Sequence, residues 1–159
     1  MAYAAALISF AFVKRGIMEG KPVTQMKVQK MVYFAHGYHL AKYGTPLITE
    51  GFEAWKFGPV IPSIYETYKL YGSEDIVDTT LIPDEQHLEL ELAELGARAE
   101  DAINYTWDAT GDVSARDLSA WTHKPDSPWA EAFKPDTMSI PIRNDRIEKY
   151  FTGVLTSNG

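Results

Sequence analysis

Histidine is the residue type in this chain whose spacing could support metal binding. The four histidines are His36, His39, His87 and His123. His36 and His39 are three residues apart, so on one helix both imidazoles could supply ligands to one metal ion. The HExxH pattern of zinc peptidases is absent, and the nearest acidic residues are Glu19 and Glu50. We therefore expect no metal site, and interpret both histidines as hydrogen-bonded structural or partner-facing residues.

Other common catalytic chemistries need motifs that this sequence lacks. It has no cysteine, no G-x-S-x-G, no Walker A loop and no G-x-G-x-x-G. Ser114, Ser119 and Ser127 are better explained as helix caps or helix-surface residues. Adjacent acids such as Glu74-Asp75 and Glu100-Asp101 point in different directions on a helix, which indicates solvated faces. We expect no catalytic residues and no cofactor.

The charge balance argues against nucleic-acid binding. The chain has 159 residues with 22 acids and 15 Lys or Arg, for a net charge of −7. No basic run exceeds two residues, whereas phosphate binding draws most of its affinity from clustered cations. An acidic protein of this size is better suited to association with a basic protein partner. The length and the hydrophobic fraction of 45% predict one domain over residues 1–159.

The first segment is apolar from Ala2 to Val13, but Lys14-Arg15 follow it and no basic residue precedes it. That order is wrong for a secretory signal, and twelve residues are too few to span a bilayer, which needs about 20. We expect a cytoplasmic protein that has no membrane contact and whose first helix is buried.

Helical periodicity accounts for most of the first half of the chain. Leu7, Ile8, Ala11 and Phe12 predict a helix over 4–18. A second helix follows Thr24 as its cap and ends near Gly44, with a buried stripe made of Val28, Met31, Val32, Ala35 and His39. These two helices are expected to pack as a hairpin.

In the next segment the hydrophobic pattern changes from helical spacing to alternation. Alternating residues predict a short β-ribbon near residues 47–57, followed by a turn at Gly58-Pro59. Pro62 then opens a third helix that carries Ile64, Tyr65, Tyr68 and Tyr71 and closes at Gly72.

The second half predicts a loop over 72–86 and further helices. One runs from about Leu88 to Trp107, or begins only after Gly96. Ser114 with Asp117 resembles a capping box that opens a short helix. Ser127-Pro128 opens another, and Asn144 caps a last turn or two before a frayed tail at 157–159. The expected fold is a mainly α single compact domain of about six helices.

Aromatic residues are densest around the ribbon and the third helix, where Trp55 and Phe57 precede Tyr65, Tyr68 and Tyr71. Such a group can form an aromatic core or a partner surface, because Tyr and Trp are enriched in binding hot spots. The spacing favours the core.

An ordered series of short motifs resembles a known family. The series runs KMVYFAHGYHLA at 30–41, FEAWKFGPVIP at 52–62, KLYG at 69–72, LSAWTH at 118–123, SPW at 127–129 and IEKYF at 147–151. It is similar to the Panacea domain of SocA-like, phage-associated antitoxins over about residues 4–152. The stretch from 75 to 94 carries no recognisable motif.

The resemblance implies a mainly α-helical antitoxin of a bacterial or prophage toxin–antitoxin system. Such a protein neutralises a cognate protein toxin by direct binding. The alternative within the family is a proteolytic adaptor that delivers the toxin to an AAA+ protease, which would then be a second partner.

The resemblance also marks candidate site residues, which are structural or partner-binding. They are Lys30, Tyr33, His36, Trp55, Gly58, Pro59, Val60, Tyr65, Thr122, His123, Pro128 and Trp129. We expect Trp55 and Phe57 to anchor the central turn, and His123 to end its helix and pair with a backbone carbonyl or with Tyr33. A family that binds different toxins would keep its scaffold, so the discriminating contacts are expected on the first helix or the 72–86 loop.

A different class of function remains open at this point. Tyr33, His36, Lys56 and His123 could converge on a pocket that binds a small molecule or catalyses a reaction on it. That alternative requires these four side chains to meet in one open cleft.

Overall fold

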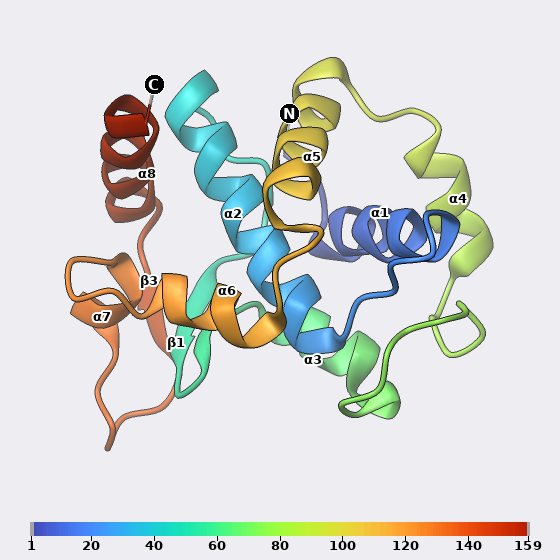
Figure 1. The fold of residues 1–159 in the computed structure, drawn as a ribbon, viewed down its shortest axis with the longest axis horizontal. Helices are drawn as coiled ribbons and strands as arrows, with labels where there is room; N and C mark the ends of the chain where they lie inside the picture. The colour runs from blue at the N-terminus through green and yellow to red at the C-terminus, as the bar shows by residue number, and fades with distance from the viewer. Residues whose placement is uncertain (1, 159) are drawn as a thin grey trace.

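Helix α2, Gln25–Tyr43, runs through the middle of the molecule (Figure 1). The computed structural model describes residues 2–158, with side chains up to residue 155. The Thr24 side chain accepts a hydrogen bond from the N–H of Lys27, and Gly44 adopts a left-handed φ of 71° at the other end. Both predicted ends of this helix are confirmed, because each residue satisfies backbone groups that the helix leaves unpaired.

Within the described residues the chain forms eight α-helices, one 3₁₀ turn and one small sheet, which confirms the mainly α class. The other helices are α1 (Ala5–Met18), α3 (Pro62–Tyr68), α4 (Glu85–Leu92), α5 (Ala97–Thr110), α6 (Ala115–Thr122), α7 (Pro128–Ala132) and α8 (Asn144–Asn158). The 3₁₀ turn is Lys69–Tyr71. Helix α2 packs most extensively against α8 and α5.

Two predicted helix boundaries differ in the structure. The segment expected to be one helix from Leu88 to Trp107 is divided into α4 and α5. Gly96 stands in an extended conformation before α5, so the alternative start after Gly96 is the correct one. Helix α8 is longer than the expected turn or two, because buried Ile147 and Phe151 pack it along α2. The backbone of 157–158 is helical, and residue 159 lies outside the described residues.

The predicted β-ribbon exists but is shifted along the chain. Strands β1 (Phe52–Trp55) and β2 (Gly58–Val60) form an antiparallel hairpin. Its turn is at residues 56–57, so the predicted turn at Gly58-Pro59 is wrong, and those residues belong to β2. Strand β3 (Ile140–Ile142), which was not predicted, pairs with the free side of β1 and gives the order β2-β1-β3.

Helix α1 is buried along most of its length, as expected, but it does not form a hairpin with α2. It contacts α2, α3 and α4, and Figure 1 shows it crossing α2 rather than running beside it. One cluster of buried apolar side chains extends from Ala5 in α1 to Phe151 in α8. Burial of this apolar surface is the main source of stability for such a fold.

Candidate functional site

Three consecutive backbone carbonyls at the tip of the β1–β2 hairpin lie within hydrogen-bond distance of side chains of one later segment. Trp129 Nε1 donates to the carbonyl of Trp55 at 2.6 Å. His123 Nε2 lies 3.2 Å from the carbonyl of residue 56, and Ser119 Oγ donates to that of residue 57 at 2.9 Å. We call Ser119, His123 and Trp129 the hairpin clamp. It joins two motifs that are about 65 residues apart in sequence.

Local capping explains how α6 and α7 present the clamp. The Ser114 side chain accepts from the N–H of Asp117 and starts α6, as the capping-box pattern predicts. His123 ends α6, and Ser127 then caps α7 while its hydroxyl also donates to the carbonyl of Thr122 at 2.7 Å. Pro128 occupies the first turn of α7, where its missing N–H costs nothing.

Both ring nitrogens of His123 lie close to a backbone carbonyl. Its Nδ1 lies 2.5 Å from the carbonyl of Ser119, and its Nε2 faces the hairpin carbonyl. Only an N–H can donate to a carbonyl, so a neutral imidazole satisfies one of them at a time. The ring also packs on Trp129, with centroids 3.8 Å apart. The expected pairing with a backbone carbonyl is present, whereas Tyr33 is not a partner of His123.

Gly58 makes room for a buried lysine. It has a φ of +122°, and a Cβ there would stand 2.8 Å from Lys30 Cε and 3.0 Å from both Lys30 Nζ and Thr122 Oγ1. Lys30 is only 1% exposed. Among the described residues its ammonium group has no hydrogen bond or ion pair, and burial lowers its pKa to about 8. The motif residues Lys30, Gly58 and Thr122 therefore meet at one point, from α2, β2 and α6.

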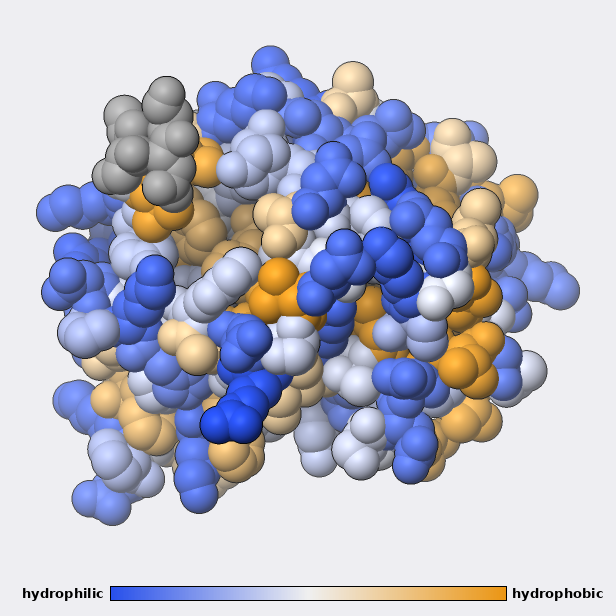
Figure 2. All heavy atoms as spheres, in the orientation of Figure 1, coloured by the Kyte–Doolittle hydropathy of each residue, from blue (hydrophilic) through white to orange (hydrophobic). Residues whose placement is uncertain are grey.

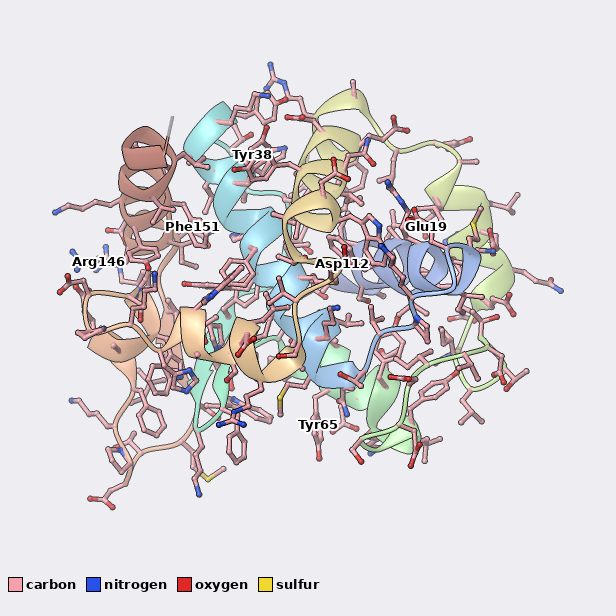
Figure 3. The ribbon with its side chains drawn as sticks, viewed as in Figure 1. Glu19, Tyr38, Tyr65, Asp112, Arg146 and Phe151 are labelled. Atoms are coloured by element: carbon pink, nitrogen blue, oxygen red, sulfur yellow. The ribbon has the colours of Figure 1, made fainter. Side chains whose placement is uncertain are left out.

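Beside this point lies a groove of about 1050 Å³, formed by the start of α2, the hairpin, α3 and the loop after α7. Its lining includes large exposed apolar side chains such as Phe57, which is 60% exposed, and Met138, which is 89% exposed. Tyr65 also lines it and projects from α3 away from the body of the molecule (Figure 3). We call this cavity the hairpin groove.

The other candidate residues of the hairpin have mixed positions. Pro59 and Val60 are buried, and Trp55 is half-buried with its ring 5.6 Å from that of Tyr65. The expectation that Phe57 anchors the turn is wrong, because its ring is largely exposed. The turn is instead held through its carbonyls by the hairpin clamp. The aromatic group is thus divided: Tyr68 is in the core, whereas Phe57 and Tyr65 are at the surface.

Tyr33 and His36 lie in the core. The Tyr33 ring packs edge-on against Phe52 and Phe151, and its hydroxyl is buried without a partner among the described residues, so burial raises its pKa. His36 is 0% exposed, with Nε2 2.9 Å from Asn144 Oδ1 and Nδ1 accepting from the N–H of Ile48. Burial lowers the pKa of His36 to about 4.

The pocket that a small-molecule function would need is not formed by these residues. Of Tyr33, His36, Lys56 and His123, only Lys56 lines the hairpin groove. His36 is enclosed with both ring nitrogens engaged, and His123 is occupied by the clamp. No trio of His, Asp or Glu side chains within residues 2–158 is arranged to hold a metal ion.

The two surfaces where discriminating contacts were expected differ in exposure. Helix α1 is mostly buried and offers little surface. The segment between α3 and α4 exposes Val77 and Leu81, and Figure 2 shows hydrophobic groups gathered over this side of an otherwise largely hydrophilic face. Sequence reasoning did not identify the loop after α7, which supplies Phe133 and Met138 to the groove, because no motif marks it.

Comparisons with known proteins agree on one family. The family model described as "Antitoxin SocA-like, Panacea domain" matches residues 28–130. The curated protein "Antitoxin SocA" of Caulobacter vibrioides (strain NA1000 / CB15N) is 34% identical over 111 residues, or 68% of this chain and 58% of the relative. The match thus spans less than two thirds of that relative's length. No solved structure matches the chain. No helix within the described residues is long and apolar enough to cross a membrane.

Proposed function

This chain belongs to the SocA-like antitoxin family that carries the Panacea domain, and from this membership we propose that it neutralises a cognate protein toxin by binding it directly. Similarity to an antitoxin suggests a non-enzymatic role. The proposal includes action in the cytoplasm and a single domain over the whole chain.

The observation that best supports direct binding is the hairpin groove. Contiguous exposed apolar surface on a monomer is typical of a protein-interaction site. Its aromatic and methionine side chains are the types that are enriched at the centre of protein interfaces. The hairpin clamp fixes the tip of the hairpin, so this surface is ordered before a partner arrives, which lowers the entropy cost of binding.

Co-expression tests the proposal. Each product of an adjacent gene is induced alone and together with this protein, and growth is followed. We expect one product to arrest growth alone, to be harmless in the presence of this protein and to co-purify with it. The proposal fails if no neighbour is toxic, or if toxicity persists at matched expression levels.

The same cells distinguish binding from delivery to a protease. Under the adaptor alternative, the half-life of the toxic product shortens when this protein and an AAA+ protease are both present. Under direct neutralisation, growth is rescued while the half-life of the toxic product is unchanged, including in cells that lack the protease.

A further inference from the structure

The hairpin groove has a charge that is opposite to that of the whole protein. The chain has 22 acids and 15 Lys or Arg, yet the groove lining contains two lysines, Lys30 and Lys56, and no Asp or Glu. The surface of an acidic protein is expected to repel an acidic ligand. Two cations without an acid among the lining residues favour an acidic ligand in the groove, although Glu74 and Asp136 adjoin lining residues in sequence.

Lys30 is the more informative of the two lysines. It is unfavourable to withdraw an ammonium group from water without a counter-charge, so buried lysines are normally paired. Within residues 2–158 Lys30 has no such pair, although it lines the groove. The fold also makes room for the Lys30 side chain. Because Gly58 has no side chain, the terminal atoms of Lys30 fit beside Thr122 Oγ1.

A second unpaired polar atom lines the same groove. Gln25 Oε1 is buried without a hydrogen-bond partner among the described residues. An unpaired acceptor can be satisfied by a donor such as a peptide N–H. An unpaired ammonium group is best satisfied by a carboxylate. The apolar side chains between them fit aliphatic or aromatic groups. A peptide segment supplies all three.

We propose that the hairpin groove binds a segment of the partner protein that combines apolar side chains with a carboxylate, and that this carboxylate pairs with the ammonium group of Lys30. The inference rests on the proposed function, because the partner is the toxin. Lys30 is then kept at a cost to the stability of the free protein and is neutralised in the complex.

The test uses the full-length protein and 15-residue peptides that tile each adjacent gene product, with affinity measured by fluorescence anisotropy. We expect at least one peptide to bind the wild type, and Lys30→Met to weaken that binding at least tenfold. Lys149→Met, on α8 and away from the groove, is the matched control and is expected to bind as the wild type does.

A second arm identifies the carboxylate. Each Asp or Glu of the bound peptide is replaced by Asn or Gln, and a peptide ending in a C-terminal carboxylate is also made as the amide. One replacement is expected to weaken binding of the peptide to the wild type at least tenfold. The same replacement is expected not to weaken binding of the peptide to Lys30→Met any further. Equal affinity of all these peptides for the wild type would overturn the inference.

Two further controls distinguish failure of this inference from a folding defect and from failure of the antitoxin proposal. Lys30→Met is close to isosteric and removes a buried charge, so its melting temperature is expected to equal or exceed that of the wild type. If no peptide binds, the intact toxic product is used: equal affinity for wild type and Lys30→Met overturns this inference while the antitoxin proposal stands. If no product binds the wild type, both fail.

Discussion

Two buried ionisable side chains on α2 differ in whether the fold supplies them with hydrogen-bond partners. His36 has both ring nitrogens engaged by Asn144 and Ile48, so the neutral imidazole is satisfied without a charge. Lys30, six residues earlier, has a terminal group that can only donate and no acceptor among the described residues. The first arrangement contributes to stability, and the second is costly until a ligand supplies an acceptor.

His36 should make the fold sensitive to acid. Its folded-state pKa of about 4 lies below the ordinary 6.5 of an exposed histidine, so the unfolded chain takes up a proton first as the pH falls. Stability that is present above pH 6.5 is therefore lost towards pH 4, at up to about 1.4 kcal/mol per pH unit. We expect His36→Gln to remove this component of the slope in urea unfolding measured across that range.

The control for this prediction is His87→Gln, because the His87 side chain is largely exposed. This variant should retain the part of the slope that is assigned to His36. His39, whose pKa is also lowered by burial, is present in all three proteins, so the comparison isolates His36 together with its electrostatic coupling to His39. An unchanged slope in His36→Gln would contradict the assignment of the acid sensitivity to this residue.

Gly58 should tolerate no side chain. Its left-handed φ already disfavours other residues, and a Cβ would meet Lys30 and Thr122. We expect Gly58→Ala to lower the free energy of unfolding by about 1–3 kcal/mol in urea denaturation. Gly51→Ala is the matched control, because a Cβ at Gly51 meets nothing within 4 Å and its φ is not positive. A similar loss in both variants would show that the φ and the close contacts of Gly58 do not cause its loss of stability.

At the scale of secondary-structure elements, α6 and α7 act as a support for the hairpin. The turn at residues 56–57 has no type of residue that would specify it strongly. Its carbonyls are contacted by side chains from outside the hairpin. A two-stranded hairpin is marginal by itself, so external support and β3 are needed to fix it. The family motifs at 52–62 and 118–129 are thus explained by one contact region.

Trp129→Phe should loosen this support selectively. The substitution keeps a ring next to His123 and Phe133 but removes the donor to the carbonyl of Trp55. We expect a loss of about 1 kcal/mol in stability and faster amide hydrogen exchange in residues 52–60, followed by mass spectrometry.

Trp107→Phe provides the comparison. Its Nε1 donates to Glu19 at 3.1 Å, so this variant also loses one tryptophan hydrogen bond, but between α5 and the end of α1. The overall loss of stability should be similar, with no selective change in the hairpin. Equal acceleration of hairpin exchange in both variants would argue against the clamp.

The elements that were predictable from sequence are those whose ends have a local chemical cause. Thr24, Gly44 and Ser114 act within one turn of their own position, so their roles could be predicted without the fold. Strand β3 and the hairpin turn depend on pairing with distant segments, which short apolar runs do not reveal. The groove was missed for the same reason, since Lys30 becomes unusual only when α2, β2 and α6 meet.

At the scale of the whole molecule, the packing of α8 on α2 joins the last described segment to the centre of the fold. Gly37 faces Phe151, and a Cβ at Gly37 would overlap the Phe151 ring. The close approach of the two helices therefore depends on a residue without a side chain. The sequence predicted both helices, but not that Gly37 is their contact point.

Gly37→Ala should consequently separate α8 from α2, at a cost of about 1–3 kcal/mol for overpacking. Phe151→Leu reduces the ring that the new methyl group meets, so the double variant should lose less stability than the sum of the two single variants in urea unfolding. Gly153→Ala, where a Cβ meets nothing within 4 Å, should instead be neutral or stabilising by about 0.5–1 kcal/mol. Strict additivity of Gly37→Ala and Phe151→Leu would mean that the two residues do not limit the helix spacing, and the docking of α8 would then depend on its other buried contacts, such as Ile147.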